Sequence, residues 1–193
     1  MSNLLIVRHG QSEWNAVNRW QGQEDSPLSE HGRQQAFAAS VHVGVVDLIV
    51  ASDLERARVT AEIIAESIGV GPVQVDPDLR ERHAGEWQGL TRSEIHERFP
   101  GWLDDGRRPE GWEPDEAVVE RASASLRRWA PVGATILVVS HGGVIRTLET
   151  SLGEPGRRVP NLGGRTFVGE DTFHLGEAIE LIDEDLATTP QGI

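Results

Sequence analysis

Three short apolar runs recur along the chain, at residues 4–7, 45–52 and 135–139, and polar sequence bounds each of them. Runs of this length without alternation are typical of strands that are buried on both faces of a sheet. A shorter stretch at residues 73–75 alternates apolar and polar positions and predicts a fourth strand. The runs therefore indicate a sheet that lies in the interior of the protein.

Helical spacing of apolar residues follows most of these runs. It predicts helices over residues 11–17, 29–39, 53–68, 91–99, 115–129 and 143–152, with Ser12 and Ser29 near N-caps and Gly69 at a C-terminus. Near the end of the chain, residues 172–175 and 178–182 predict a hairpin across Gly176-Glu177. Strands that alternate with helices predict an α/β fold, a three-layer α/β/α sandwich with a mostly parallel central sheet. No linker divides the chain, so we expect one domain over residues 1–193.

Two segments lack a regular pattern. Residues 79–90 hold several charged side chains between glycines, and we interpret them as a loop too polar to belong to a core. Residues 100–114 are rich in Gly, Pro, Trp and Asp and predict a lid or rim. We expect Trp14 and Trp87 to be core or staple residues, whereas Trp102 and Trp112 are better candidates for a rim.

The charge of the chain limits its partners. A formal net charge of −13 argues against binding to nucleic acid or to an anionic membrane, because both need a basic surface. All 18 basic residues are arginines, so an anionic ligand requires a local arginine cluster, and the planar guanidinium suits that purpose. Cysteine is absent, which excludes disulfides and thiolate catalysis. Without a signal peptide or an apolar run of membrane-spanning length, we expect a cytoplasmic protein.

Charged residues stand where three predicted strands end. Arg8-His9-Gly10 follows the first run, Arg56 lies just after the second, and His141 comes directly after the third. The carboxyl ends of parallel strands meet at one edge of a sheet, where α/β proteins bind ligands. A neutral imidazole can attack phosphorus, and guanidinium groups can neutralise the transferring phosphoryl group. Each residue alone has a structural explanation, but their joint placement favours a phosphate site.

At these positions the chain resembles the histidine phosphatase superfamily, also called phosphoglycerate mutase-like. The signature Arg8-His9-Gly10-Gln11-Ser12-Glu13-Trp14-Asn15 carries the resemblance, together with residues 21–22, 26–36, 52–61, 79–90 and 139–143. These motifs keep their order over about residues 4–150. The stretches 20–23 and 85–90 are most similar to broad-specificity phosphatases and, among them, to actinobacterial glucosyl-3-phosphoglycerate phosphatases.

The resemblance implies a role for each matching residue. His9 would accept the phosphoryl group, and Glu81 would act as general acid, since an alcohol leaving group needs a proton. The residues implied to bind the phosphoryl oxygens are Arg8, Arg56, His141, Asn15, Gln21 and the backbone N–H of Gly142. The structural alternative for Glu81 is a salt bridge to Arg80 or Arg82.

The implied function is hydrolysis of phosphomonoesters of small metabolites, of sugar phosphate or phosphoglycerate type, through a phosphohistidine and without cofactor or metal. Paired histidines lack a third ligand for zinc, and the arginines would repel a cation. One alternative is a cofactor-dependent phosphoglycerate mutase, which the short interval 90–135 and Gln21 disfavour. Another is a non-catalytic relative that binds a phosphorylated ligand, which would lack one of the key residues.

Two regions leave questions open. Residues 111–114 read Gly-Trp-Glu-Pro where related phosphatases often carry Gly-Glu-Ser, so the substrate is not assigned. Residues 153–193 match the family poorly and could equally serve a homodimer.

Overall fold

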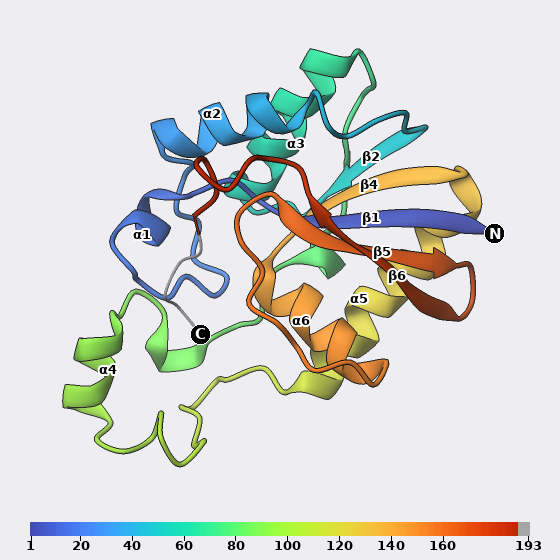
Figure 1. Ribbon diagram of the computed structural model, residues 1–193. Helices are drawn as coiled ribbons and strands as arrows, with labels where there is room; N and C mark the ends of the chain where they lie inside the picture. Colours follow the sequence, from blue (N-terminus) through green and yellow to red (C-terminus); the bar gives the residue numbers. More distant parts are fainter. Residues whose placement is uncertain (189–193) are drawn as a thin grey trace.

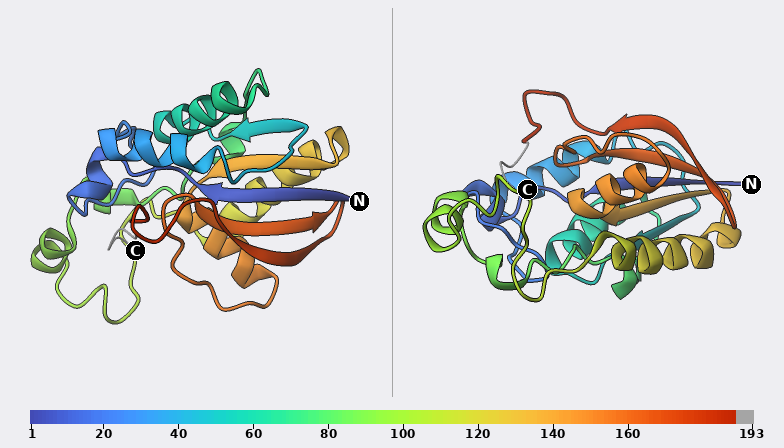
Figure 2. Two further views of the ribbon diagram at one scale, coloured as in Figure 1. Left: turned by 45° about the horizontal axis from the view of Figure 1, so that its top comes forward. Right: turned by 90° about the horizontal axis from the view of Figure 1, so that it is seen from below.

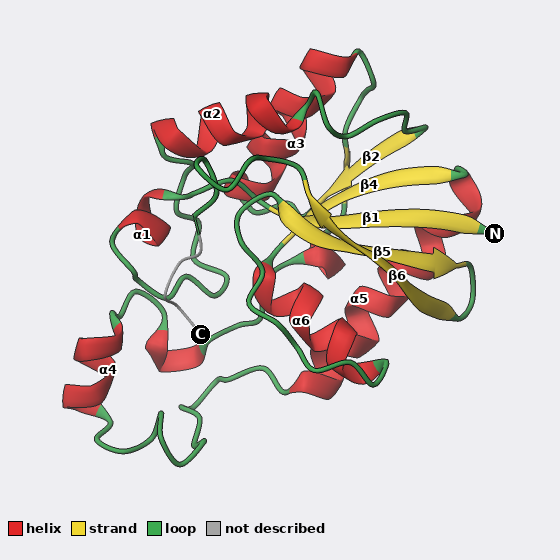
Figure 3. Cartoon of the chain, in the orientation of Figure 1, coloured by secondary structure: helices red, strands yellow, loops and turns green. Residues whose placement is uncertain are grey.

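A single six-stranded sheet forms the centre of the computed structural model, which describes residues 1–188 (Figures 1 and 3). Its strands, in the order β3-β2-β4-β1-β5-β6, are β3 Gln74–Val75, β2 Leu48–Ala51, β4 Thr135–Ser140, β1 Ser2–Arg8, β5 Gly163–Gly169 and β6 Phe173–Glu180. The first four are parallel, and β5 and β6 join antiparallel at the side of β1. The prediction of a mostly parallel sheet is confirmed.

Helices cover both faces of the sheet (Figure 2). They are α1 Glu13–Ala16, α2 Glu30–Ala39, α3 Glu55–Ile68, α4 Arg92–Arg98, α5 Asp115–Trp129 and α6 Gly142–Ser151. Ser12 and Ser29 are N-caps whose side chains accept backbone N–H groups, and Gly69 ends α3 in the left-handed conformation. The helices therefore begin and end close to the predicted residues. No helix within residues 1–188 is long and apolar enough to cross a membrane.

Successive residues of the strands point to opposite faces, which gives two separate cores. On one face, Val7 and Val139 pack with α2 and α3, whereas on the other Leu4, Ile6 and Val138 pack with α5 and α6. All five side chains are fully buried. The three-layer α/β/α sandwich follows from this division. The second apolar run is a strand only from Leu48 onward.

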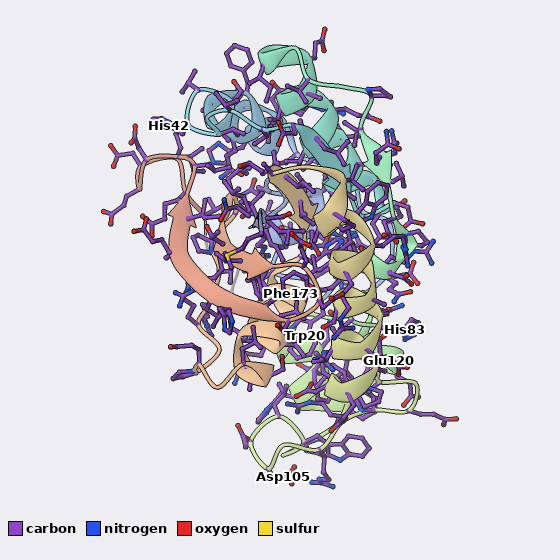
Figure 4. All side chains as sticks on the ribbon, turned by 90° about the vertical axis from the view of Figure 1, so that its right-hand side faces the viewer. Trp20, His42, His83, Asp105, Glu120 and Phe173 are labelled. Carbon is purple, nitrogen blue, oxygen red and sulfur yellow. The ribbon has the colours of Figure 1, made fainter. Side chains whose placement is uncertain are left out.

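A third core lies away from the sheet and corrects one prediction. Residues 79–90 are not simply a polar loop, because Trp87 is fully buried and contacts Trp20, Trp112 and Phe99. The prediction that Trp87 is a core residue is thereby confirmed, whereas the interpretation of residues 79–90 as a loop outside any core is wrong. Trp14 is half-buried and lies against Gly89. Figure 4 places Trp20 in the interior and Asp105 at the tip of the irregular segment 100–114.

The predicted hairpin across Gly176-Glu177 is wrong. β6 runs without interruption through both residues and pairs with β5, so the turn lies at residues 170–172. Gly176 stands next to a register shift in β5, where an added Cβ would lie 3.1 Å from Cβ of Thr166. This glycine permits a close approach between two strands instead of a reversal of the chain. β5 has few apolar residues, and the sequence pattern did not predict it.

Candidate active site

The carboxyl ends of β1 and β4 bring two histidines together. The strands are parallel neighbours with Arg8 paired to Ser140, so His9 and His141 follow side by side. Their ring centroids are 5.1 Å apart, and both side chains are buried. In Figure 1 this edge of the sheet faces the side on which α1 and α4 lie.

His9 is held in the form that a nucleophile requires. Its Nδ1 lies 2.6 Å from the carbonyl oxygen of Gly10. A carbonyl only accepts hydrogen bonds, so Nδ1 carries the proton and Nε2 keeps its lone pair in the neutral ring. Burial, reinforced by the charges of Arg56 and Arg8, holds the pKa of His9 well below its usual value of 6.5. The imidazole is therefore neutral at pH 7.

Three distant segments fix the backbone around His9. The His9 N–H donates to Ser140 O (3.0 Å), Asn161 Nδ2 donates to His9 O (2.8 Å), and the Gly10 N–H donates to Thr60 Oγ1 (3.1 Å). Asn161 and Thr60 were missed in the sequence. Thr60 lies within residues 52–61, which carry the family resemblance, but no role was assigned to it, and Asn161 lies in the segment 153–193 that matches the family poorly. Their relation to His9 arises only from the packing of the chain.

Arg8 and Arg56 bring positive charge to the same place. Arg56, in the first turn of α3, donates to the carbonyl oxygens of Glu24 and Gly22, both at 2.8 Å, and Arg8 donates to Val159 O at 2.9 Å. These bonds hold each guanidinium in one orientation. Burial lowers the pKa of Arg8 and of Arg56 to about 10, so both remain charged at pH 7.

Several buried polar atoms at this point have no hydrogen-bond partner among residues 1–188. They are Nε of Arg8, Nε of Arg56 and both ring nitrogens of His141. An unsatisfied buried polar group costs about 1–3 kcal/mol, so a concentration of them is expected where a ligand supplies the missing partner. Burial, followed by the charge of Arg56, also holds the pKa of His141 well below 6.5. The arrangement suits an anion with several oxygens.

Glu81 approaches the pocket from the segment before Trp87. Its Oε1 accepts the N–H of Arg82 at 2.8 Å, and its Oε2 accepts the N–H of Gly143 at 3.0 Å. Arg80 pairs with Asp53 and Arg82 with Asp115, so the side-chain salt bridge considered for Glu81 is not what the structure contains. The carboxylate is instead fixed by backbone groups, one of them at the start of α6.

These side chains line one cavity of about 90 Å³. The predicted residues that line it are Arg8, His9, Asn15, Gln21, Arg56, Glu81 and Gly142. His141 lies against His9 and is fully buried. Gln21 Oε1 accepts from Ser12 Oγ at 2.7 Å, which leaves the amide nitrogen of Gln21 as a donor for a ligand. Within residues 1–188 there is no cluster of His, Asp and Glu that could hold a metal ion.

The sequence of the chain matches the model of the histidine phosphatase superfamily (branch 1) over residues 4–163. The chain belongs to this superfamily. It is 40% identical over 178 residues to glucosyl-3-phosphoglycerate phosphatase of Mycolicibacterium vanbaalenii, covering 83% of this chain and 79% of that one. It is 36% identical over 173 residues to phosphoglycerate mutase-like protein 4 of Arabidopsis thaliana, covering 83% and 75%.

A solved histidine phosphatase has the same architecture. The structure of mycobacterial glucosyl-3-phosphoglycerate phosphatase with VO3 superposes with a TM-score of 0.79 at 33% identity, covering 91% of this chain and 97% of that one. The phosphoglycerate mutase-like fold that the resemblance implied is thereby confirmed.

The cavity of this histidine phosphatase also includes residues to which the sequence assigned no role in the site. They are Asn18, Arg19, Trp20, Gly22, Arg82, Gly143, Arg146, Arg157, Arg158 and Val159. Arg157, Arg158 and Val159 come from the segment between α6 and β5, which resembles the family least. His42, His96 and His174, which match no family motif, are exposed, whereas His31 is half-buried beside Gln35.

Proposed function

We propose that the chain hydrolyses phosphate monoesters of small metabolites, with His9 as the residue that is transiently phosphorylated. The observation that carries this proposal is the hydrogen bond of His9 Nδ1 to Gly10 O, which directs a free Nε2 lone pair into a pocket with two fixed arginines. The membership in the histidine phosphatase superfamily supports the same activity.

In the first step, Nε2 of His9 attacks phosphorus and the bond to the ester oxygen breaks. Arg8, Arg56 and His141 donate to the three phosphoryl oxygens, and the two arginines balance the negative charge of these oxygens. The protonated carboxyl of Glu81 gives its proton to the departing alkoxide, which leaves as an alcohol. The products of this step are a phosphohistidine and a Glu81 carboxylate.

In the second step, a water molecule replaces the alcohol. The Glu81 carboxylate takes a proton from the water as its oxygen attacks phosphorus, and the bond from phosphorus to Nε2 breaks. Inorganic phosphate leaves, and Glu81 is protonated again for the next cycle. The backbone donors on Glu81 come from Arg82 and Gly143 and hold the carboxylate in one place throughout.

Hydrolysis is favoured over the mutase reaction. A mutase must keep water away from its phosphohistidine. The mutases that this chain resembles are longer, with an insertion between the general acid and the second histidine. Here α5 begins at Asp115, directly after the irregular segment 100–114, and β4 follows it closely. A pocket without such an added cover allows water to reach the phosphohistidine.

The relatives suggest the kind of substrate. A glucosyl-3-phosphoglycerate phosphatase is among the relatives at 40% identity, and this supports a natural substrate of sugar phosphate or phosphoglycerate type. A cytoplasmic location and a homodimer that uses residues 153–193 stay predictions. Residues 189–193 of that segment lie outside the described part of the chain.

The decisive experiment traps the intermediate. Rapid acid-free quenching of the enzyme with a ³²P-labelled ester is expected to give a protein-bound phosphate that is stable to alkali and labile to acid. His9→Ala should abolish both this label and the release of p-nitrophenol from p-nitrophenyl phosphate.

The matched control is His42→Ala, which removes an exposed histidine on the outer surface of the molecule (Figure 4). This variant should keep full activity and full labelling. Label found on a serine or a carboxylate, or label that persists in His9→Ala, would overturn the proposal.

A further inference from the structure

Arg121 is a largely buried arginine in the middle of α5 that the mechanism does not use. Its side chain is 17% exposed. Val118 and Ser125, about one helical turn before and after it on the same face, are fully buried where α5 packs on the sheet (Figure 2). The guanidinium therefore stands on a rigid element and points to the interior.

All five N–H donors of this guanidinium are used in hydrogen bonds. Nε and Nη2 donate to the two carboxylate oxygens of Glu113, at 2.7 and 2.9 Å. Nη1 donates to the carbonyl oxygens of Asp78 and Arg80 at 2.8 and 2.5 Å, and Nη2 also donates to that of Glu81 at 3.2 Å. This set of partners fixes the planar fork in one orientation.

The three carbonyls belong to the stretch that ends at the proposed general acid. Carbonyl oxygens carry partial negative charge, so three that converge repel one another unless a cation lies between them. The side-chain amide of Gln23 donates to the same Glu81 oxygen at 3.0 Å. The main chain of Glu81 is thus held by α5 and by the loop after α1, whereas its carboxylate is held by the N–H groups of Arg82 and Gly143.

Glu113 holds the other side of the guanidinium. Its Oε2 also accepts the N–H of His83 at 3.0 Å, so one carboxylate connects Arg121 to a residue just after Glu81. Burial acts to raise the pKa of Glu113, but the hydrogen bonds and charge of Arg121 outweigh it and hold this pKa below its usual value. The pair is therefore ionised at pH 7. Its carboxylate comes from residues 111–114, the segment that departs from the pattern of related phosphatases.

We propose that Arg121 is a positioning residue for the general acid: together with Glu113 and Gln23, it places the main chain of Glu81 so that the carboxyl reaches the departing ester oxygen. The inference rests on the proposed phosphatase function. Arg121 is not among the residues that line the cavity, so it acts through Glu81 and not on the substrate. A general acid must lie within about 2.6–3.2 Å of the oxygen that it protonates, so even a small shift of its main chain impairs proton transfer.

Arg128 provides a matched comparison on the same helix. It lies about two turns after Arg121 and forms ion pairs with the carboxylates of Asp76 and Asp78, both at 2.7 Å. These ion pairs also connect α5 to the segment before Glu81, but through side chains and not through the main chain of the acid. An arginine that only stabilises the fold should behave like Arg128.

The test compares glycerol 3-phosphate with p-nitrophenyl phosphate, whose leaving group needs little protonation. Arg121→Met keeps an apolar stem and removes every donor, so it should lower the ratio of the two kcat/KM values, alkyl over aryl ester, about tenfold. The loss should appear in kcat for glycerol 3-phosphate, with KM changed by less than about twofold, because the residues that bind the phosphoryl group stay in place. Arg128→Met should lower the midpoint of urea unfolding and leave the ratio unchanged.

Two milder variants test the same main-chain position. Gln23→Ala removes the other side-chain donor to Glu81 O from a half-buried position, and Glu113→Gln removes the charge that holds Arg121 while keeping the shape of the side chain. Each should lower the same ratio about threefold. These variants decide the question if Arg121→Met does not fold, which circular dichroism establishes.

The two levels of the proposal fail in different ways. A folded Arg121→Met with the wild-type ratio, or with equal losses on both esters, would show that Arg121 only stabilises the fold. An unchanged ratio in both Gln23→Ala and Glu113→Gln would lead to the same conclusion. Absence of phosphate release by the wild type from every ester, including p-nitrophenyl phosphate, would instead overturn the phosphatase function.

Discussion

Gly143 and Glu81 touch so closely that no other residue fits at position 143 without displacing the carboxylate. The Gly143 N–H donates to Glu81 Oε2 at 3.0 Å, and a Cβ on Gly143 would lie 2.3 Å from Oε1. The first turn of α6 therefore determines where the proposed general acid stands. A glycine in a helix lowers stability by about 1 kcal/mol relative to alanine, so its presence here indicates a requirement for space.

Gly143→Ala should consequently impair proton donation by Glu81 more than the attack by His9. We expect kcat/KM for alkyl phosphates such as glycerol 3-phosphate to fall about 10²-fold, because general acid catalysis contributes that much to departure of a basic alkoxide. p-Nitrophenyl phosphate, whose leaving group needs little protonation, should lose much less. Steady-state kinetics on both substrates measures the difference.

Glu81→Gln provides the comparison for this variant. It keeps the side chain's shape and removes only the proton donor, so it should produce the same preference for p-nitrophenyl phosphate. If kcat/KM fell equally on both substrates in the two variants, Glu81 would not be the general acid.

Asn161 offers a test of how the backbone positions His9, the proposed nucleophile. Its Nδ2 donates to His9 O, and its Oδ1 accepts from Thr188 Oγ1, so this buried amide ties the segment before β5 to the end of β1. Asn161→Ala should reduce kcat about tenfold, because small displacements of a reacting group are costly. The control is Asn3→Ala, which replaces an exposed asparagine on β1 and should leave kcat unchanged. If Asn161→Ala lowered only the thermal stability and not kcat, Asn161 would have no positioning role.

The contrast between His9 and Asn161 shows what local sequence reveals. The strand that ends at Arg8, the caps at Ser12 and Ser29 and the helix that begins at Asp115 depend on neighbours in the chain, and they were predicted closely. Asn161 instead donates to the backbone of His9, 152 positions earlier in the chain, and no local pattern records this contact. β5 was missed for a related reason, since it is held by β1 and β6 rather than by its own apolar residues.

Trp87 should be a major source of stability outside the sheet. It is fully buried in the third core, with Trp20, Trp112 and Phe99 around it. Trp87→Ala should lower the free energy of unfolding by about 3–5 kcal/mol, as is typical of large aromatic residues in cores. Phe37→Ala, which removes a 66% exposed ring from α2, should cost less than about 0.5 kcal/mol. Urea unfolding followed by circular dichroism measures both, and similar costs would show that the segment 79–90 contributes no core.

The buried histidines predict how stability depends on pH. The pKa values of His9 and His141 lie well below 6.5 in the folded protein, so the unfolded chain binds more protons below that pH. The free energy of unfolding should therefore decrease as the pH falls from 6.5 to 5, by up to about 1.4 kcal/mol per pH unit for each histidine, and should level off above pH 7. Carboxyls with a lowered pKa, such as Asp76 and Glu113, lose their stabilising effect only at more acid pH.

Urea unfolding between pH 5 and 8 measures the slope of the free energy of unfolding against pH. His141→Asn should remove about half of it, whereas His42→Asn, which replaces an exposed histidine, should leave it intact. A wild-type slope near zero across this interval would mean that the two rings accept protons in the folded protein. His9 would then be charged at mildly acid pH and unable to attack phosphorus, so the same measurement also bears on the proposed mechanism.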